Sequence, residues 1–141
     1  MNQPPMRGPA VNRRSATTPP ADFPPKRLSD VLSSLLAIPG VLGASFIDPQ
    51  GQSVAHAGDP AATEVLSAYE SVWMGELGRA GERSGLGALG DVTLDFERKR
   101  VLTSAVKDGY FVLVVLDAGG LVSVVRARLE EARERLSSEI G

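Results

Sequence analysis

Residues 109–116 read GYFVLVVL, and the seven residues from Tyr110 to Leu116 are all apolar. A strand with one solvated face alternates apolar and polar side chains, so an unbroken apolar run indicates a strand buried on both faces. The residues that follow, Asp117-Ala-Gly-Gly, are typical of a turn. The stretch therefore predicts the central strand of a sheet that is covered on both sides.

A long helix is predicted after this turn. Its apolar residues recur at spacings of three and four, which places them on one stripe. They are Val122, Val125, Leu129, Ala132, Leu136 and Ile140. Most other positions are Arg or Glu, and oppositely charged pairs four residues apart, such as Arg126 and Glu130, stabilise a helix by only about 0.2–0.5 kcal/mol each. We interpret these positions as a solvated face without chemistry.

The first 27 residues differ in composition from the rest of the chain. They hold seven of the ten prolines, and five basic residues against one acidic residue. Such a segment can build neither a core nor a regular helix, so residues 1–27 are predicted to be a disordered tail and residues 28–141 one folded domain. A basic tail could contact an acidic surface or serve only as a solvated linker, and both interpretations stay open.

Charge and composition exclude several classes of protein. Residues 28–141 carry 10 basic and 16 acidic residues, and nucleic-acid binding depends on basic groups that neutralise phosphates. The chain has no cysteine, so disulfide and thiolate chemistry are excluded. No run approaches the roughly 18 apolar residues that a membrane span needs, and the N-terminus lacks the apolar core of a signal peptide. We therefore expect a cytoplasmic protein that neither inserts into membranes nor binds nucleic acid.

Turn residues and periodicity predict the remaining elements. Ser29 is a candidate N-cap for a first helix that ends at Pro39-Gly40. Strands are predicted at 41–47, 52–57, 92–96 and 100–106, and a second helix opens with Asp59 as N-cap and Pro60 at its first position. The order is α-β-β-α-β-β-β-α. We expect an α+β sandwich within the broad α/β class: a five-stranded antiparallel sheet with two helices on one face and one on the other.

The second helix, roughly residues 60–78, carries the most informative surface. Its apolar residues gather on one wide face, which we expect to cover the sheet. They are Ala62, Val65, Leu66, Tyr69, Val72, Trp73 and Leu77. The opposite side consists of Glu64, Ser67, Ala68, Ser71, Met74 and Gly75. Most of these are small and would let another helix approach closely, so we interpret this side as a docking face. The alternative is that they reflect a chain rich in small residues.

The sequence indicates neither a catalytic nor a metal site. His56 is the only histidine, and it has no nucleophile elbow nearby and no second His or Cys to complete a metal site. Residues 85–90 match GxGxxG, but a helix precedes them and a strand follows, the reverse of the dinucleotide-binding order. We interpret residues 78–90 as a flexible connection. No Walker-type loop is present, and we expect no catalytic residue, metal or cofactor.

Three stretches resemble the roadblock/dynein-light-chain domain family. They are IPGVLGASFID at 38–48 followed by Gly51, the apolar strand that ends at Leu116-Asp117, and LVSVVRARL at 121–129. The resemblance covers residues 28–141. Bacterial members of this size include the Mgl-type polarity regulators, and we expect the chain to fall in that subgroup. The Pro-rich tail is not part of the minimal family pattern.

The resemblance implies a homodimer in which two sheets join edge to edge and the second helices pack together. The joining strand would be Val92, Thr93, Leu94, Asp95 and Phe96. It also implies a non-enzymatic, activator-type regulator that docks on a small Ras-like GTPase and repositions that protein's own catalytic groups, without an arginine finger. The alternative is a scaffold or ligand-sensing adaptor on the same fold, with no effect on GTP turnover.

Overall fold

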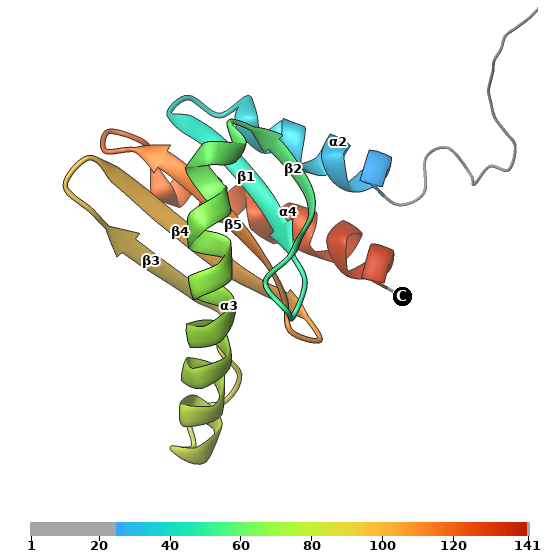
Figure 1. Cartoon of the computed structure of the whole chain (residues 1–141), viewed down its shortest axis with the longest axis vertical. Helices are drawn as coiled ribbons and strands as arrows, with labels where there is room; N and C mark the ends of the chain where they lie inside the picture. Colours follow the sequence, from blue (N-terminus) through green and yellow to red (C-terminus); the bar gives the residue numbers. More distant parts are fainter. Residues whose placement is uncertain (1–24, 141) are drawn as a thin grey trace, which may run out of the picture.

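The computed structural model of the chain describes residues 25–140. Within them, three helices and five strands follow one another in the expected order α-β-β-α-β-β-β-α (Figure 1). They are α2 (Pro25–Leu36), β1 (Val41–Ile47), β2 (Ser53–Gly58), α3 (Pro60–Arg83), β3 (Asp91–Asp95), β4 (Lys99–Lys107), β5 (Tyr110–Asp117) and α4 (Val122–Ile140).

The five strands form one antiparallel sheet in the order β2-β1-β5-β4-β3. The apolar run is β5, and it is the central strand, as its composition predicts. Residues 111–116 are all buried. Val112 lies opposite Phe46 of β1 and Ser104 of β4. β2 and β3 are the two edge strands.

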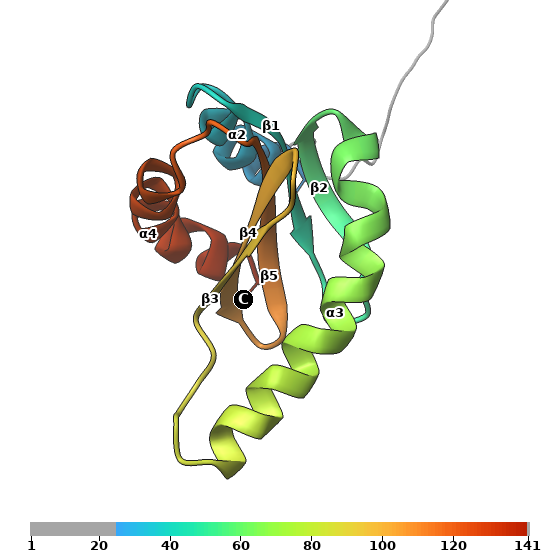
Figure 2. The ribbon, with the colours of Figure 1, turned by 90° about the vertical axis from the view of Figure 1, so that its left-hand side faces the viewer.

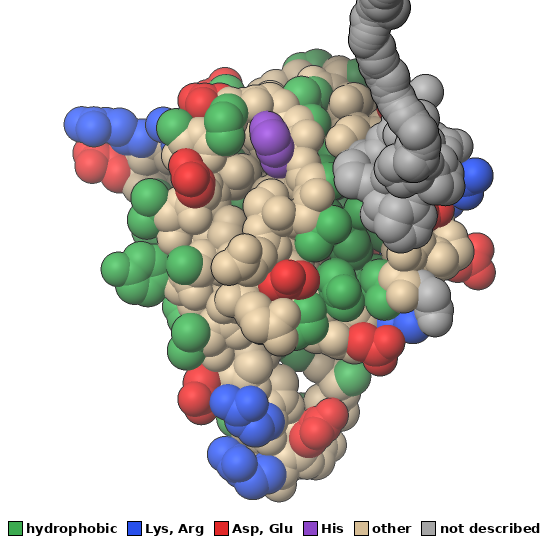
Figure 3. Space-filling model, turned by 45° about the vertical axis from the view of Figure 1, so that its right-hand side comes forward, with side chains coloured by type: hydrophobic (Ala, Val, Ile, Leu, Met, Phe, Trp, Pro, Cys, Tyr) green, Lys and Arg blue, Asp and Glu red, His purple; other side chains and the backbone are tan. Residues whose placement is uncertain are grey.

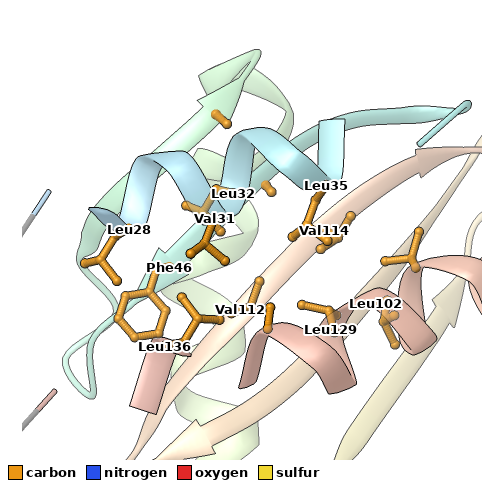
Figure 4. Close-up of a cluster of buried hydrophobic side chains, with 14 of the residues drawn as sticks. Leu28, Val31, Leu32, Leu35, Phe46, Leu102, Val112, Val114, Leu129 and Leu136 are labelled. Carbon is orange, nitrogen blue, oxygen red and sulfur yellow. The ribbon is translucent and has the colours of Figure 1, made fainter. Parts of the chain in front are cut away.

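Helices α2 and α4 cover one face of the sheet and enclose the main hydrophobic core (Figures 2 and 4). The predicted stripe of α4 provides four buried residues, among them Val125 and Leu136. α2 buries Leu28, Val31, Leu32 and Leu35 against the same face. Burial of a large aliphatic side chain stabilises a fold by about 1.5–3 kcal/mol, so this layer is the main source of stability.

Helix α3 lies alone on the opposite face (Figure 2), and the sandwich therefore has the expected two-helix and one-helix faces. The buried apolar clusters are smaller here. One joins Ile47, Met74 and Phe111, and the other joins Val101, Leu113 and Val115. α3 is 24 residues long, and its C-terminal half continues beyond the edge of the sheet (Figure 1).

Two predicted helix boundaries are wrong. α2 begins at Pro25, so Ser29 lies inside the helix and residues 25–27 belong to the helix and not to a structureless tail. Proline is tolerated there because the first turn of a helix needs no backbone N–H donor. α3 continues to Arg83, past the predicted end at 78. Its start is confirmed: the side chain of Asp59 accepts a hydrogen bond from the backbone N–H of Ala61, at 3.1 Å.

Candidate interaction surface

Helix α3 is rotated relative to the predicted orientation, so that part of the predicted docking face lies against the sheet. The residues buried beneath it are Thr63, Ser67, Glu70 and Met74. Four of the seven apolar residues that were expected to cover the sheet are instead exposed, with Val65 at 69%, Tyr69 at 64% and Val72 at 62% of their full accessibility. The other three, Ala62, Leu66 and Trp73, are half-buried, and the first two of them pack against the sheet. The predicted orientation of this helix is therefore wrong.

The sheet explains why small polar residues can be buried here. Beneath α3, β1 presents Gly43 and Ser45, and a Cβ atom at Gly43 would lie 3.1 Å from the carbonyl oxygen of Asp59. At its N-terminal end the helix thus approaches β1 too closely for large side chains. The hydroxyl of Ser67 donates to the carbonyl oxygen of Thr63 at 2.8 Å, so it is buried without losing its hydrogen bond.

Glu70 is a carboxyl group buried in this layer, and its side chain is completely inaccessible. The hydroxyl of Thr103 on β4 donates a hydrogen bond to its Oε1. Its Oε2 is buried without a hydrogen-bond partner, and no salt bridge among the described residues includes it. Burial raises the pKa of Glu70, because the charged form is poorly solvated there, although the hydrogen bond from Thr103 acts in the opposite direction. The site therefore favours the neutral acid.

The predicted small-residue docking face is divided by this orientation. Ser67 and Met74 are buried against the sheet, Ser71 and Gly75 are half-buried, and only Glu64 and Ala68 are exposed. Ser67 and Met74 therefore cannot contact a partner while α3 stays in place.

The small residues have a use inside the protomer. A Cβ atom at Gly51, in the β1–β2 turn, would lie 2.7 Å from the Oγ of Ser71 and 3.5 Å from the Cα of Ala68. The small side chains of α3 therefore let this turn approach the helix.

Four large apolar residues of α3 are exposed, and we call this set the α3 stripe. It consists of Val65, Tyr69, Val72 and Leu77. Figure 3 shows hydrophobic side chains in a row along one margin of the molecule. An exposed row of this kind indicates a surface that another macromolecule covers.

An apolar cavity adjoins the N-terminal half of the stripe. It has a volume of about 310 Å³ and lies between α3 and the β3–β4 turn. Its lining residues are Ala62, Leu66, Phe96, Arg98, Lys99, Val101 and Val115. Phe96 is 53% exposed. The cavity extends the exposed apolar surface from the helix to the edge of the sheet.

β3 is the edge strand next to this surface, and among the described strands it pairs only with β4. The strand covers Asp91–Asp95, so four of the five residues from Val92 to Phe96 lie in it and Phe96 follows its end. Val92 and Leu94 are half-buried and belong to clusters on the α3 side of the sheet. Thr93 and Asp95 are exposed. The strand thus offers a free backbone edge beside an apolar surface.

The other face of β3 is held by α4. The two carboxylate oxygens of Asp91 accept hydrogen bonds from two arginines, Oδ2 from Nε of Arg126 at 3.3 Å and Oδ1 from Nη2 of Arg133 at 3.4 Å. The same Nη2 of Arg133 donates to Ser104 of β4 at 2.7 Å. α4 therefore fixes the edge strand from the side opposite α3. Sequence reasoning missed this contact, because it treated the arginines of α4 as solvated.

Within residues 25–140, no group of His, Asp and Glu side chains is arranged to hold a metal ion. His56 is exposed on β2. None of the helices in the same range is long and apolar enough to span a membrane. The candidate site among residues 25–140 is therefore the exposed apolar surface of α3 and its neighbouring cavity.

The sequence profile of the Roadblock/LC7 domain family matches residues 28–117. This range covers well over half of the chain, and the chain belongs to that family. β5 ends with the matched range, so α4 lies beyond it. No curated protein sequence matches the chain.

Several solved structures share the fold. The chain is similar to MglB of Myxococcus xanthus, with a TM-score of 0.73 and 17% identity over 83% of this chain and 95% of that one. It is also similar to the gliding protein MglB of Thermus thermophilus, with a TM-score of 0.72 and 20% identity over 83% and 90%. A Roadblock/LC7 domain from Streptomyces avermitilis gives 0.65 and 18% over 77% and 96%.

Proposed function

We propose that the protein is a homodimeric, non-catalytic regulator of a small Ras-like GTPase. The observation that carries the proposal is the α3 stripe beside the free edge of β3. The chain's likeness to MglB structures supports the Mgl-type role that its sequence resemblance implies, in bacterial polarity or motility. A partner of this kind places the protein in the cytoplasm.

In the dimer, β3 pairs with β3 of a second copy and the two α3 helices pack side by side. Each α3 stripe is then buried in the interface together with Phe96. The two strand edges form backbone hydrogen bonds with each other. The interface differs from the predicted docking face. It uses the apolar side of α3, while Glu64, Ala68, Ser71 and Gly75 lie outside it.

The regulator acts by docking and supplies no catalytic group. Among the described residues no group of His, Asp and Glu side chains is arranged to hold a metal ion, and a GTPase already carries the groups that bind and position its nucleotide and water. A partner that orders these groups increases turnover without entering the reaction. An adaptor that binds the GTPase without changing turnover is the alternative.

Light scattering on a sizing column tests the dimer and the partner together. We expect a mass of about twice 14.8 kDa for the protein alone, and a further complex with a Ras-like GTPase loaded with a GTP analogue but not with GDP. Phosphate release then separates the two functions: faster release supports the regulator, and binding without faster release supports the adaptor. A monomer that binds neither nucleotide form contradicts both.

A further inference from the structure

β2 is the second free edge of the sheet, on the side away from β3. Its residues 53–58 read SVAHAG, and among the described strands it pairs only with β1. Natural edge strands are commonly protected from further pairing by Lys, by Pro or by a covering segment. β2 contains neither residue. Among the described strands, none pairs with its outward backbone N–H and C=O groups.

A polar cleft of about 350 Å³ runs along β2 on the α3 side. It is lined by Gly51, Gln52, Ser53, His56, Pro60, Thr63, Glu64 and Ser67. Glu64 is the one Asp, Glu, Lys or Arg residue among them. In Figure 3 the histidine lies on a surface with few charged side chains. A strand beside β2 would place alternate side chains over this cleft, where a basic side chain would meet Glu64.

The sequence before α2 contains one segment that suits this edge. Residues 10–18 read AVNRRSATT, a run of nine without proline between Pro9 and Pro19. Val and Thr favour strands. Arg13 and Arg14 are adjacent, and adjacent side chains of a strand point to opposite faces. In either pairing register of such a strand, one of these two arginines would therefore project over the cleft.

The position of α2 fixes the direction in which this segment would run. Leu36, at the end of α2, lies at Gly58, since a Cβ atom there would be 2.9 Å from Leu36 Cδ2. Leu28, near the start of α2, lies beside Phe46, which is opposite Ala55 (Figure 4). α2 and β2 thus run in the same direction. A strand antiparallel to β2 would end near Ser53, on the side where α2 begins.

The connection is long enough. Residues 19–24 separate the run from Pro25, and six residues of extended, proline-rich chain span about 19 Å. Packed layers of a sheet protein lie about 10 Å apart. We propose that residues 10–18 add to β2 as a sixth, antiparallel strand of the same chain, with Arg13 or Arg14 against Glu64. A second copy bound through β2 would lack this charge complementarity, because it brings another Glu64 in place of an arginine.

Hydrogen exchange by NMR on the full chain tests this proposal. The variant V11P/T17P removes backbone donors within the run, and N2P/A21P is the matched control, with two prolines outside it. We expect the outward amides of β2 to exchange slowly in the wild type and in the control, and about tenfold faster or more in V11P/T17P, since a tenfold change corresponds to about 1.4 kcal/mol. R13E/R14E should also lose protection.

Two results would overturn the strand. If these amides exchange fast in the wild type and in V11P/T17P alike, the edge is free. If they are equally protected in both, another occupant such as a second copy covers β2. Full protection in R13E/R14E would overturn the contact with Glu64. The readout concerns β2 alone, so it is independent of the α3 stripe and of GTPase binding.

Discussion

Thr103 on β4 donates a hydrogen bond to Glu70 beneath α3, and this is the one described hydrogen bond of a completely buried carboxyl group. The pair lies where a sheet protein usually has apolar contacts. Because burial raises the pKa of Glu70, the folded protein holds a proton that the unfolded chain releases at a lower pH. Folding is therefore linked to proton uptake at this residue.

The sign of this linkage gives a pH prediction. Below the usual pKa of a glutamic acid both states are protonated, and Glu70 carries no penalty. As the pH rises toward the raised pKa of Glu70, the unfolded state loses its proton first and the stability falls. Each tenfold difference in the ionisation constant corresponds to about 1.4 kcal/mol. Above the raised value the loss stays constant.

The variant E70Q tests this effect. Gln cannot ionise, and its carbonyl oxygen can accept the hydrogen bond from Thr103. We expect the stability of E70Q relative to the wild type to rise by about 1 kcal/mol or more between pH 4.5 and pH 8, in urea unfolding at constant protein concentration. E82Q, at an exposed position of the same helix, is the control and should leave the pH profile unchanged. If the unfolding free energies of E70Q and the wild type change in parallel with pH, the raised pKa of Glu70 is contradicted.

Y69E places a charge in the centre of the α3 stripe. Tyr69 is 64% exposed in the protomer, so the fold should persist, while a dimer that buries this position would have to desolvate the carboxylate. We expect the mass to fall to that of a monomer, with an unchanged circular dichroism spectrum. A127E adds the same charge at an exposed position of α4 and should remain dimeric. If Y69E is also a dimer, the α3 stripe is not part of the dimer interface.

The orientation of α3 shows where sequence reasoning stops. Val65, Tyr69 and Val72 have the spacing of a core-facing stripe, and periodicity cannot tell whether such a stripe meets its own sheet or another molecule. β5 was predicted correctly, because seven apolar residues in a row leave no solvated face. Gly43 and Ser45 could have indicated the true orientation. Small residues on a buried strand let a helix approach closely, and large helix side chains then do not fit between the helix and the strand.

The pairing of side chains that lie far apart in the sequence was even harder to predict. Asp91 and Arg133 are 42 residues apart, and nothing in the charge pattern of α4 distinguishes Arg133 from the solvated arginines around it. The contact exists because β3 lies at the edge next to β4, which α4 covers. Sheet order has to be known before such a pair can be inferred.

D91A should weaken the attachment of β3 to α4. It removes the acceptor of two arginines and leaves Arg133, which is about two-thirds buried, with Ser104 as its described partner. We expect a loss of about 1–2 kcal/mol in unfolding free energy, because hydrogen bonds to charged groups contribute about 1.5–3 kcal/mol and this site is partly exposed. E131A, which breaks the exposed pair with Arg128, is the control and should change stability by less than about 0.5 kcal/mol.

A double-mutant cycle identifies the source of the loss. If Asp91 acts through Arg133, the losses in D91A and R133A will not add in the double variant, because both remove the same interaction. Additive losses would show that the two residues act separately. The hydrogen bond between Asp91 and Arg133 would then contribute no coupling energy to the folded state.

The last prediction concerns the contact between the β1–β2 turn and α3. Gly51 has a φ of +88°, and a Cβ atom there would lie 2.7 Å from Ser71 Oγ and 3.2 Å from Ser71 Cβ. G51A therefore introduces two problems, a left-handed backbone that costs an L-residue roughly 1–2 kcal/mol and a steric overlap with α3. G85A shares only the first, because Gly85 has a φ of +77° and open space around it.

The difference between the two variants isolates the overlap. We expect G51A to lower the unfolding free energy by about 1 kcal/mol more than G85A, in the range typical of overpacking, and S71A to recover part of the loss in G51A but none in G85A. Equal losses in G51A and G85A would mean that the turn moves away from the helix without resistance. The small residues of α3 at 68 and 71 would then have no packing role in the protomer, and their use as a docking face for a partner would again be the better explanation.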